Sequence, residues 1–311
     1  AQTFGALAFG LARYRPDVPF HGVLANHVGS ERHAQMLEQA VPSDLRWLGH
    51  VEASERMELP GRHLGLHQAD EIDDLEARIE CAADALAGTA LAGLPAAVDF
   101  PPAPALAPRR LLDGLHVAIA RDAAFSFIYP ANVSLLEALG ARVSFFSPLA
   151  DEAVPDDADA LYLPGGYPEL HAAALAGCAH SAESIRAHAS ANKTLVAECG
   201  GMLYLLESLT DAEGTATSML GLLPGHATMQ TRLAALGMQE LDTRHGTMTG
   251  HTFHYSRVTT PLNPERHATR PQRGAVGEPV FRHGSIIATY MHGYWPSNPA
   301  LAAALFHGEP L

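Results

Sequence analysis

The sequence predicts an α/β protein whose main part is a doubly wound, mostly parallel sheet with helices on both faces. From residue 116 onward, short apolar runs alternate with helical patterns, as in right-handed β–α–β crossovers. A proline-rich stretch, residues 93–112, separates this part from what precedes it. One apolar run ends in a cysteine followed by two glycines. Such a corner is typical of sites at the carboxyl ends of parallel strands.

The residues before the proline-rich stretch predict a small α/β unit over 1–92. An amphipathic helix opens the chain, and a strand at 20–28 leads into a helix at 30–41, with Ser30 as its N-cap. A second strand at 46–51 and a helix at 70–86 follow. The chain opens without methionine, so we expect a fragment or a processed protein.

The residues after that stretch predict a second domain over 113–311. We expect its main elements at the following positions: strands at 116–120, 142–147, 160–164 and 194–198, and helices at 131–140 and 181–190. From about residue 217, extended segments punctuated by glycine predict an antiparallel addition. A helix at 299–307 closes the chain.

Composition excludes several classes of protein. Asp and Glu outnumber Lys and Arg by 34 to 20, and the net charge of −14 argues against nucleic-acid binding. No apolar run is long enough to span a membrane, and no signal peptide is evident. Three scattered cysteines predict no disulfide framework, so we expect a reduced, cytoplasmic protein without a bound metal at these residues.

Cys199 is the candidate nucleophile. Gly200 and Gly201 permit a sharp strand-to-helix turn, and the start of the following helix is expected to lower the thiol pKa. A buried structural cysteine is the alternative. Cys81 is typical of a small hydrophobic residue on a helix and Cys178 of a loop residue, and neither is assigned a role.

A thiolate that attacks an acyl group also needs a base and an oxyanion hole. His292 is the candidate base, because it stands where a strand gives way to a Gly/Pro-rich loop. The segment LPGGYPELH (163–171) exposes backbone N–H groups of two glycines at a strand end, and these are candidate oxyanion donors. Gly165, Tyr167 and Glu169 are candidates for contact with the substrate.

Three segments, YLPGGYPELH, ECGGMLYL and TYMHGYWPSNP, resemble in order and spacing the class I glutamine amidotransferase domain. More narrowly, they are similar to those of the cobyrinic or hydrogenobyrinic acid a,c-diamide synthases of cobalamin biosynthesis. GVLANHVGSERH (22–33) and LPGRHLGL (59–66) resemble the end of that family's P-loop-type ATP-binding domain. The resemblance implies an amidotransferase-type sheet preceded by part of an ATPase domain.

The activity implied by the resemblance is that of a carbon–nitrogen ligase. Cys199 would hydrolyse glutamine with His292 as proton carrier, and backbone N–H groups around Gly166 and Gly200 would hold the oxyanion. Ammonia would amidate the a and c acetates of cobyrinic or hydrogenobyrinic acid. ATP and Mg²⁺ are implied cofactors, and Asn26 matches a position that contacts adenine. No G-x-x-x-x-G-K-[ST] motif occurs in the chain, so the phosphate site is expected elsewhere. A homodimer is also expected.

Other interpretations stay open at this point. Tyr294 stands where many class I amidotransferases have a glutamate that orients the histidine. A cobyric acid synthase would share the glutaminase chemistry. A non-catalytic domain of the same fold, or a generic cysteine hydrolase, would not select glutamine.

Overall fold

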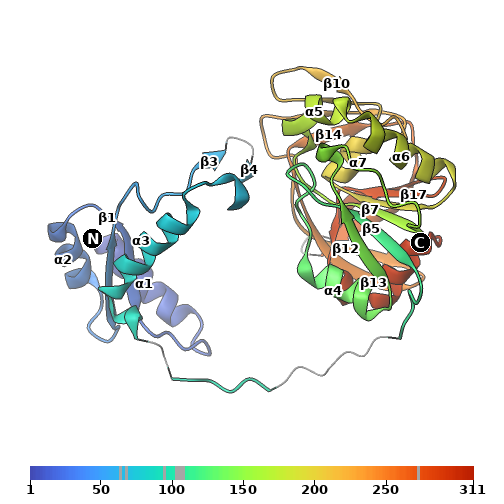
Figure 1. Ribbon diagram of the computed structural model, residues 1–311. Helices are drawn as coiled ribbons and strands as arrows, with labels where there is room; N and C mark the ends of the chain where they lie inside the picture. Colours follow the sequence, from blue (N-terminus) through green and yellow to red (C-terminus); the bar gives the residue numbers. More distant parts are fainter. Residues whose placement is uncertain (63–64, 67–68, 94–95, 102–108, 272–273) are drawn as a thin grey trace. The chain divides into compact units, whose positions relative to one another are not determined.

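The computed structural model describes residues 1–62, 65–66, 69–93, 96–101, 109–271 and 274–311. The chain divides into two compact units, Ala1–Ala103 and Pro104–Leu311. The division falls within the predicted linker, of which residues 94–95 and 102–108 lie outside the described ranges. Figure 1 labels the elements of both units.

Unit 1 is built on two parallel strands, β1 and β2. Its small core contains Ala25, Val28, Ala34 and Leu37, with Phe4 and Trp47 packed against them. The elements of this unit are α1 (Gln2–Tyr14), β1 (Val23–Val28), α2 (Glu31–Ala40), β2 (Trp47–Glu52), β3 (Gly61–Arg62), β4 (Gly65–Leu66) and α3 (Leu75–Ala87).

Three details of unit 1 bear on the predictions. The hydroxyl oxygen of Ser30 accepts a hydrogen bond from the backbone N–H of His33 at 3.2 Å, which confirms the predicted N-cap of α2. The segment LPGRHLGL supplies β3 and β4, and its residues 63–64 lie outside the described ranges. Helix α3 begins at Leu75, five residues later than predicted, because a short 3₁₀ turn, Ala69–Glu71, precedes it.

Unit 2 contains a ten-stranded sheet in the order β18-β13-β12-β15-β16-β17-β8-β7-β5-β6. The strands from β17 to β6 pair in parallel. Their bounds are β5 (His116–Ala120), β6 (Arg142–Phe146), β7 (Ala160–Leu163), β8 (Thr194–Glu198) and β17 (Ile286–Thr289). The four strands predicted between residues 116 and 198 are therefore confirmed.

The parallel strands are covered on both faces, as predicted for a doubly wound sheet. Alternate residues of β8 belong to different cores: Leu195 and Ala197 face one, and Val196 faces the other. The first core includes side chains of α6 and α7, and the second those of α4 and α8. The helices are α4 (Pro130–Ala138), α5 (Ala172–Gly177), α6 (Ala179–Ser190), α7 (Gly200–Leu205) and α8 (Pro299–Phe306).

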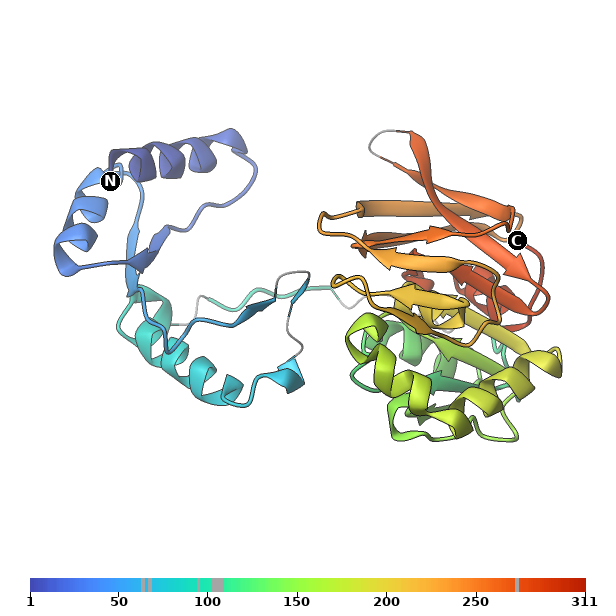
Figure 2. The same ribbon diagram turned by 90° about the horizontal axis from the view of Figure 1, so that it is seen from above.

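The antiparallel addition extends the sheet beyond β17 and supplies most of a second sheet, β10-β9-β11-β14. Figure 2 shows the strands after residue 230 in orange, on the side of this unit away from α5 and α6. Their bounds are β9 (Ser208–Thr210), β10 (Ala216–Ser218), β11 (His226–Met229), β12 (Ala235–Thr243), β13 (Gly246–His254), β14 (Ser256–Thr259), β15 (Pro264–Arg270), β16 (Ala275–His283) and β18 (His292–Gly293). Among the helices in the described ranges, none has both the length and the apolar composition needed to cross a membrane.

Candidate active site

Cys199 occupies a strained corner between β8 and α7. Its backbone has φ 45° and ψ −108°, a conformation that costs a residue with a Cβ roughly 1–3 kcal/mol. Two backbone hydrogen bonds hold the corner: Cys199 N–H donates to the carbonyl of Thr289 at 2.8 Å, and Leu203 N–H donates to the carbonyl of Cys199 at 3.1 Å. Backbone strain is thus concentrated at the predicted nucleophile.

Glycines around this corner allow backbones to approach closely. A Cβ on Gly201 would lie 2.0 Å from the carbonyl oxygen of Leu163, so only glycine lets α7 sit this close to β7. A Cβ on Gly200 would lie 2.9 Å from the backbone nitrogen of Gly166. The structure therefore brings the two predicted oxyanion donors, Gly166 and Gly200, side by side next to Cys199.

His292 lies against the same loop. Its side chain is buried, and a Cβ on Gly165 would lie 2.4 Å from its Cε1 atom. The imidazole ring of His251 stacks on that of His292, with ring centroids 5.1 Å apart and planes 18° apart. The Nδ1 atom of His292 is buried and has no hydrogen-bond partner among the described residues. Cys199 and His292 are thus both in place at the Gly165–Gly166 turn.

Burial sets the protonation of both groups. Burial, together with the charge of Glu169, raises the pKa of the Cys199 thiol to about 12, although the N–H of Gly200 acts in the opposite direction. Burial, and then the neighbouring His251 and His254, lower the pKa of His292 to about 3. The expectation of a lowered thiol pKa is wrong for the resting protein, because the cost of burying a thiolate outweighs one helix N–H.

The predicted substrate loop carries Tyr167 and Glu169 beside the catalytic pair. The ring of Tyr167 packs edge-on against Phe127, with centroids 5.0 Å apart, and Phe127 also lies 6.1 Å from the His292 ring. Phe127 N–H donates to the carbonyl of Gly165 at 3.0 Å. Glu169 is close enough for its charge to act on the Cys199 thiol. The loop that carries the predicted substrate contacts therefore lies close to both Cys199 and His292.

A pocket of about 400 Å³ opens beside His292. His251, Tyr129 and Tyr294 contribute to its lining, and the Tyr129 hydroxyl lies 3.3 Å from Nε2 of His251. Burial, and then the charges of Glu198 and Cys199, raise the pKa of Tyr129 to about 12. The pocket therefore presents two tyrosines and a second histidine beside His292, and its described lining residues include no carboxylate and no Lys or Arg side chain.

Unit 1 contains a pocket of about 830 Å³ at the carboxyl ends of β1 and β2, lined in part by Asn26. Its apolar lining, which includes Leu24, Val51 and Leu86, suits a flat base or a nucleoside. The carboxylates of Glu52, Glu55 and Glu58 also line the pocket, and like charges disfavour a triphosphate there. The residues present therefore fit the base of ATP but not its phosphates.

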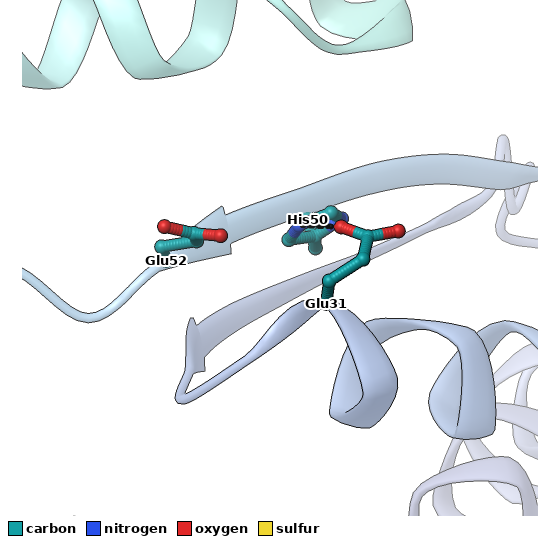
Figure 3. Close-up of side chains that lie close together, drawn as sticks. All are labelled: Glu31, His50 and Glu52. Carbon is teal, nitrogen blue, oxygen red and sulfur yellow. Dashed lines mark ion pairs between the residues drawn. The ribbon is translucent and has the colours of Figure 1, made fainter.

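Three polar side chains of unit 1, Glu31, His50 and Glu52, lie close together, as Figure 3 shows. Glu31 lies at the start of α2, and the other two lie on β2. The Nε2 atom of His50 is 3.9 Å from a carboxylate oxygen of Glu31. One ligand atom from each side chain falls within 4.8 Å of the others. Both carboxylates are exposed, and exposed acidic side chains are commonly found together without a bound metal ion.

Comparison with known proteins identifies the family. Residues 116–300 match the model of the CobB/CobQ-like glutamine amidotransferase domain. The hydrogenobyrinate a,c-diamide synthase of Pseudomonas aeruginosa is 53% identical over 306 residues, which is 98% of this chain and 70% of that protein. The chain belongs to the a,c-diamide synthase family. The cobyrinate a,c-diamide synthase of Herminiimonas arsenicoxydans is 44% identical over 99% of this chain and 70% of its own length.

A solved structure described as a glutamine amidotransferase covers 62% of this chain at 16% identity, with a TM-score of 0.44. The family assignment rests instead on the family model and the two synthases. Together with the observed sheet, the match of residues 116–300 to the family model confirms the predicted amidotransferase fold class.

Sequence reasoning missed three side chains of this a,c-diamide synthase site. Glu198, Asn132 and His251 are brought to the His292 turn from distant parts of the chain. For Glu198 a signal existed, since a glutamate in an otherwise apolar strand directly before the nucleophile needs a partner. Local sequence held no comparable signal for Asn132.

Proposed function

We propose that this a,c-diamide synthase family member hydrolyses glutamine with Cys199 as nucleophile and His292 as proton carrier. The observation that carries the proposal is the strained Cys199 corner, packed on the Gly165–Gly166 turn with His292 against the same turn. The N–H groups of Gly166 and Gly200 would bind the oxyanion. Gly165, Tyr167 and Glu169 would contact the glutamine.

The proposed glutaminase reaction follows a defined sequence of proton transfers between Cys199 and His292. Cys199 enters the reaction as a thiol, and its proton passes to neutral His292 as sulfur attacks the amide carbon. A buried imidazolium is a strong acid, so His292 returns the proton to the departing nitrogen and ammonia leaves. Water then hydrolyses the glutamyl thioester, giving glutamate and restoring the thiol.

The synthetase part of the proposal rests on the relatives. Ammonia would amidate the a and c acetate side chains of cobyrinic or hydrogenobyrinic acid, after ATP and Mg²⁺ activate the carboxylates. We assign residues 1–92 to the end of the synthetase domain, 93–112 to a linker and 113–311 to the amidotransferase domain. Asn26 and its pocket would contact the base of ATP, without its phosphates. A cytoplasmic location and a homodimer stay predictions.

Ammonia release from glutamine tests the proposal, with Cys199→Ser beside Cys178→Ser. Both cysteines are buried in unit 2, so the second variant controls for the loss of a buried thiol. We expect Cys199→Ser to lower the rate at least about 1,000-fold and Cys178→Ser to keep it within threefold. A glutamine-derived diazoketone should label Cys199 alone, as shown by peptide mass mapping. A wild-type chain that neither releases ammonia nor reacts with this probe would overturn the proposal in favour of a non-catalytic domain.

A further inference from the structure

His292 lies on a very short strand that gives it little support. β18 contains only His292 and Gly293, which pair with His251 and Gly250 of β13. The peptide after the histidine is anchored by side chains instead. Gly293 N–H donates to Oε1 of Glu198 at 3.2 Å, and its carbonyl accepts from Nδ2 of Asn132 at 2.8 Å.

Glu198 is itself firmly oriented. Its other carboxylate oxygen accepts the hydroxyl of Tyr162 at 2.7 Å, and the side chain is only 4% exposed. Glu198 is the last residue of β8, and Cys199 follows it directly at the corner before α7. One buried side chain therefore links the nucleophile's strand directly to the peptide that follows the catalytic histidine.

The surroundings of Glu198 give no stability reason for a carboxylate. It borders a void of about 30 Å³ whose lining is otherwise largely apolar and includes Val196, Met248 and Met291. Burying a charge in such surroundings is costly, and an apolar side chain of the same size is often neutral or stabilising. The hydrogen bond from Gly293 N–H indicates instead that the carboxylate is there to hold the peptide after His292.

We propose that Glu198 is a positioning residue, which holds His292 in register with Cys199 by accepting the backbone N–H of Gly293. This inference rests on the proposed glutaminase function. Displacement of a catalytic group by about 1 Å can cost ~100-fold in rate. Loss of this acceptor should therefore lower kcat while leaving KM almost unchanged, because Glu198 does not contact glutamine.

Two variants of similar size separate this role from a structural one. Glu198→Gln keeps an acceptor oxygen, and Glu198→Met removes it. We expect Glu198→Gln to keep kcat for ammonia release within about tenfold of wild type, and Glu198→Met to lose at least about 100-fold, with KM within threefold in both. Tyr162→Phe removes the hydrogen bond to the oxygen that does not face Gly293, so we expect it to stay within fivefold.

The histidine ring gives a readout independent of activity. The His292 signal in ¹⁵N-histidine spectra, assigned with His292→Gln, should move in Glu198→Met and stay in place in Glu198→Gln. A Glu198→Met protein with near-normal kcat, or equal losses in the Gln and Met variants, would overturn the proposal. If Glu198→Met fails to fold, Glu198→Leu, which also lacks an acceptor oxygen, replaces it with the same expectations. A wild-type chain that releases no ammonia would refute the glutaminase, and the ¹⁵N spectra would still test the role of Glu198.

Discussion

Cys199 and His292 differ from a reactive thiolate–imidazolium pair, because burial keeps each of them neutral. An alkylating reagent consumes only the thiolate. We therefore expect the rate of Cys199 alkylation by iodoacetamide to rise steadily from pH 6 to pH 10, as followed by mass spectrometry of its peptide. A plateau reached near pH 7 would contradict this, since it would show a thiolate already formed at neutral pH.

Glu198 should make the free energy of unfolding depend on pH. Burial raises its pKa from about 4.5 to about 7 in the folded chain, so the native state binds more protons than the unfolded state between these values. This contribution is fully present below pH 4.5 and is lost as pH rises through 7. Relative to Glu198→Gln, wild type should lose on the order of 3 kcal/mol of unfolding free energy between pH 4 and pH 8.

Urea unfolding at several pH values measures this difference. A Trp47→Phe background leaves Trp295, which is buried in unit 2, as the only tryptophan reporter. Other titrating groups are the same in both proteins, so their contributions cancel. Parallel stability curves for the two proteins would show that Glu198 titrates normally.

Among the elements, helix α7 depends on its glycines. A methyl group at Gly201 would overlap the carbonyl oxygen of Leu163, so Gly201→Ala must push α7 away from β7. We expect a loss of about 3 kcal/mol or more in stability, and of glutaminase activity with it. Gly177, at the end of α5, has open space at the same position, so Gly177→Ala should change stability by less than ~1 kcal/mol. Equal effects in thermal unfolding would contradict this account of the corner.

Some strands and helices could be predicted from the sequence more accurately than others. β5, β7 and β8 are short, continuous apolar runs, and the structure places each within a residue of its predicted bounds. The Cys199 corner was predictable because its cause, two consecutive glycines after a strand, is local. The short helix α5 was not expected, and neither was the pairing of β17 beside β8, which depends on tertiary register. Glu198 and Gly293 are 95 residues apart, so their hydrogen bond was beyond any local pattern.

At the scale of the whole molecule, the two units differ in how much apolar surface they bury. The core of unit 1 consists mainly of alanine, valine and leucine around a two-stranded sheet. Unit 2 contains two larger cores, one on each face of its parallel strands, with fully buried side chains such as Trp295 and Phe125. Because stability follows buried apolar area, unit 1 should open more easily than unit 2.

Hydrogen exchange followed by mass spectrometry tests this difference on the intact chain. Peptides from β1 and β2 should exchange at least about 100-fold faster than peptides from β5, β7 and β8, which corresponds to roughly 3 kcal/mol between the two opening reactions. All the proposed glutaminase groups lie in unit 2, so ammonia release should persist at a urea concentration that already exposes β1 and β2. A single common exchange rate, or activity lost together with the protection of unit 1, would show instead that the two units unfold as one.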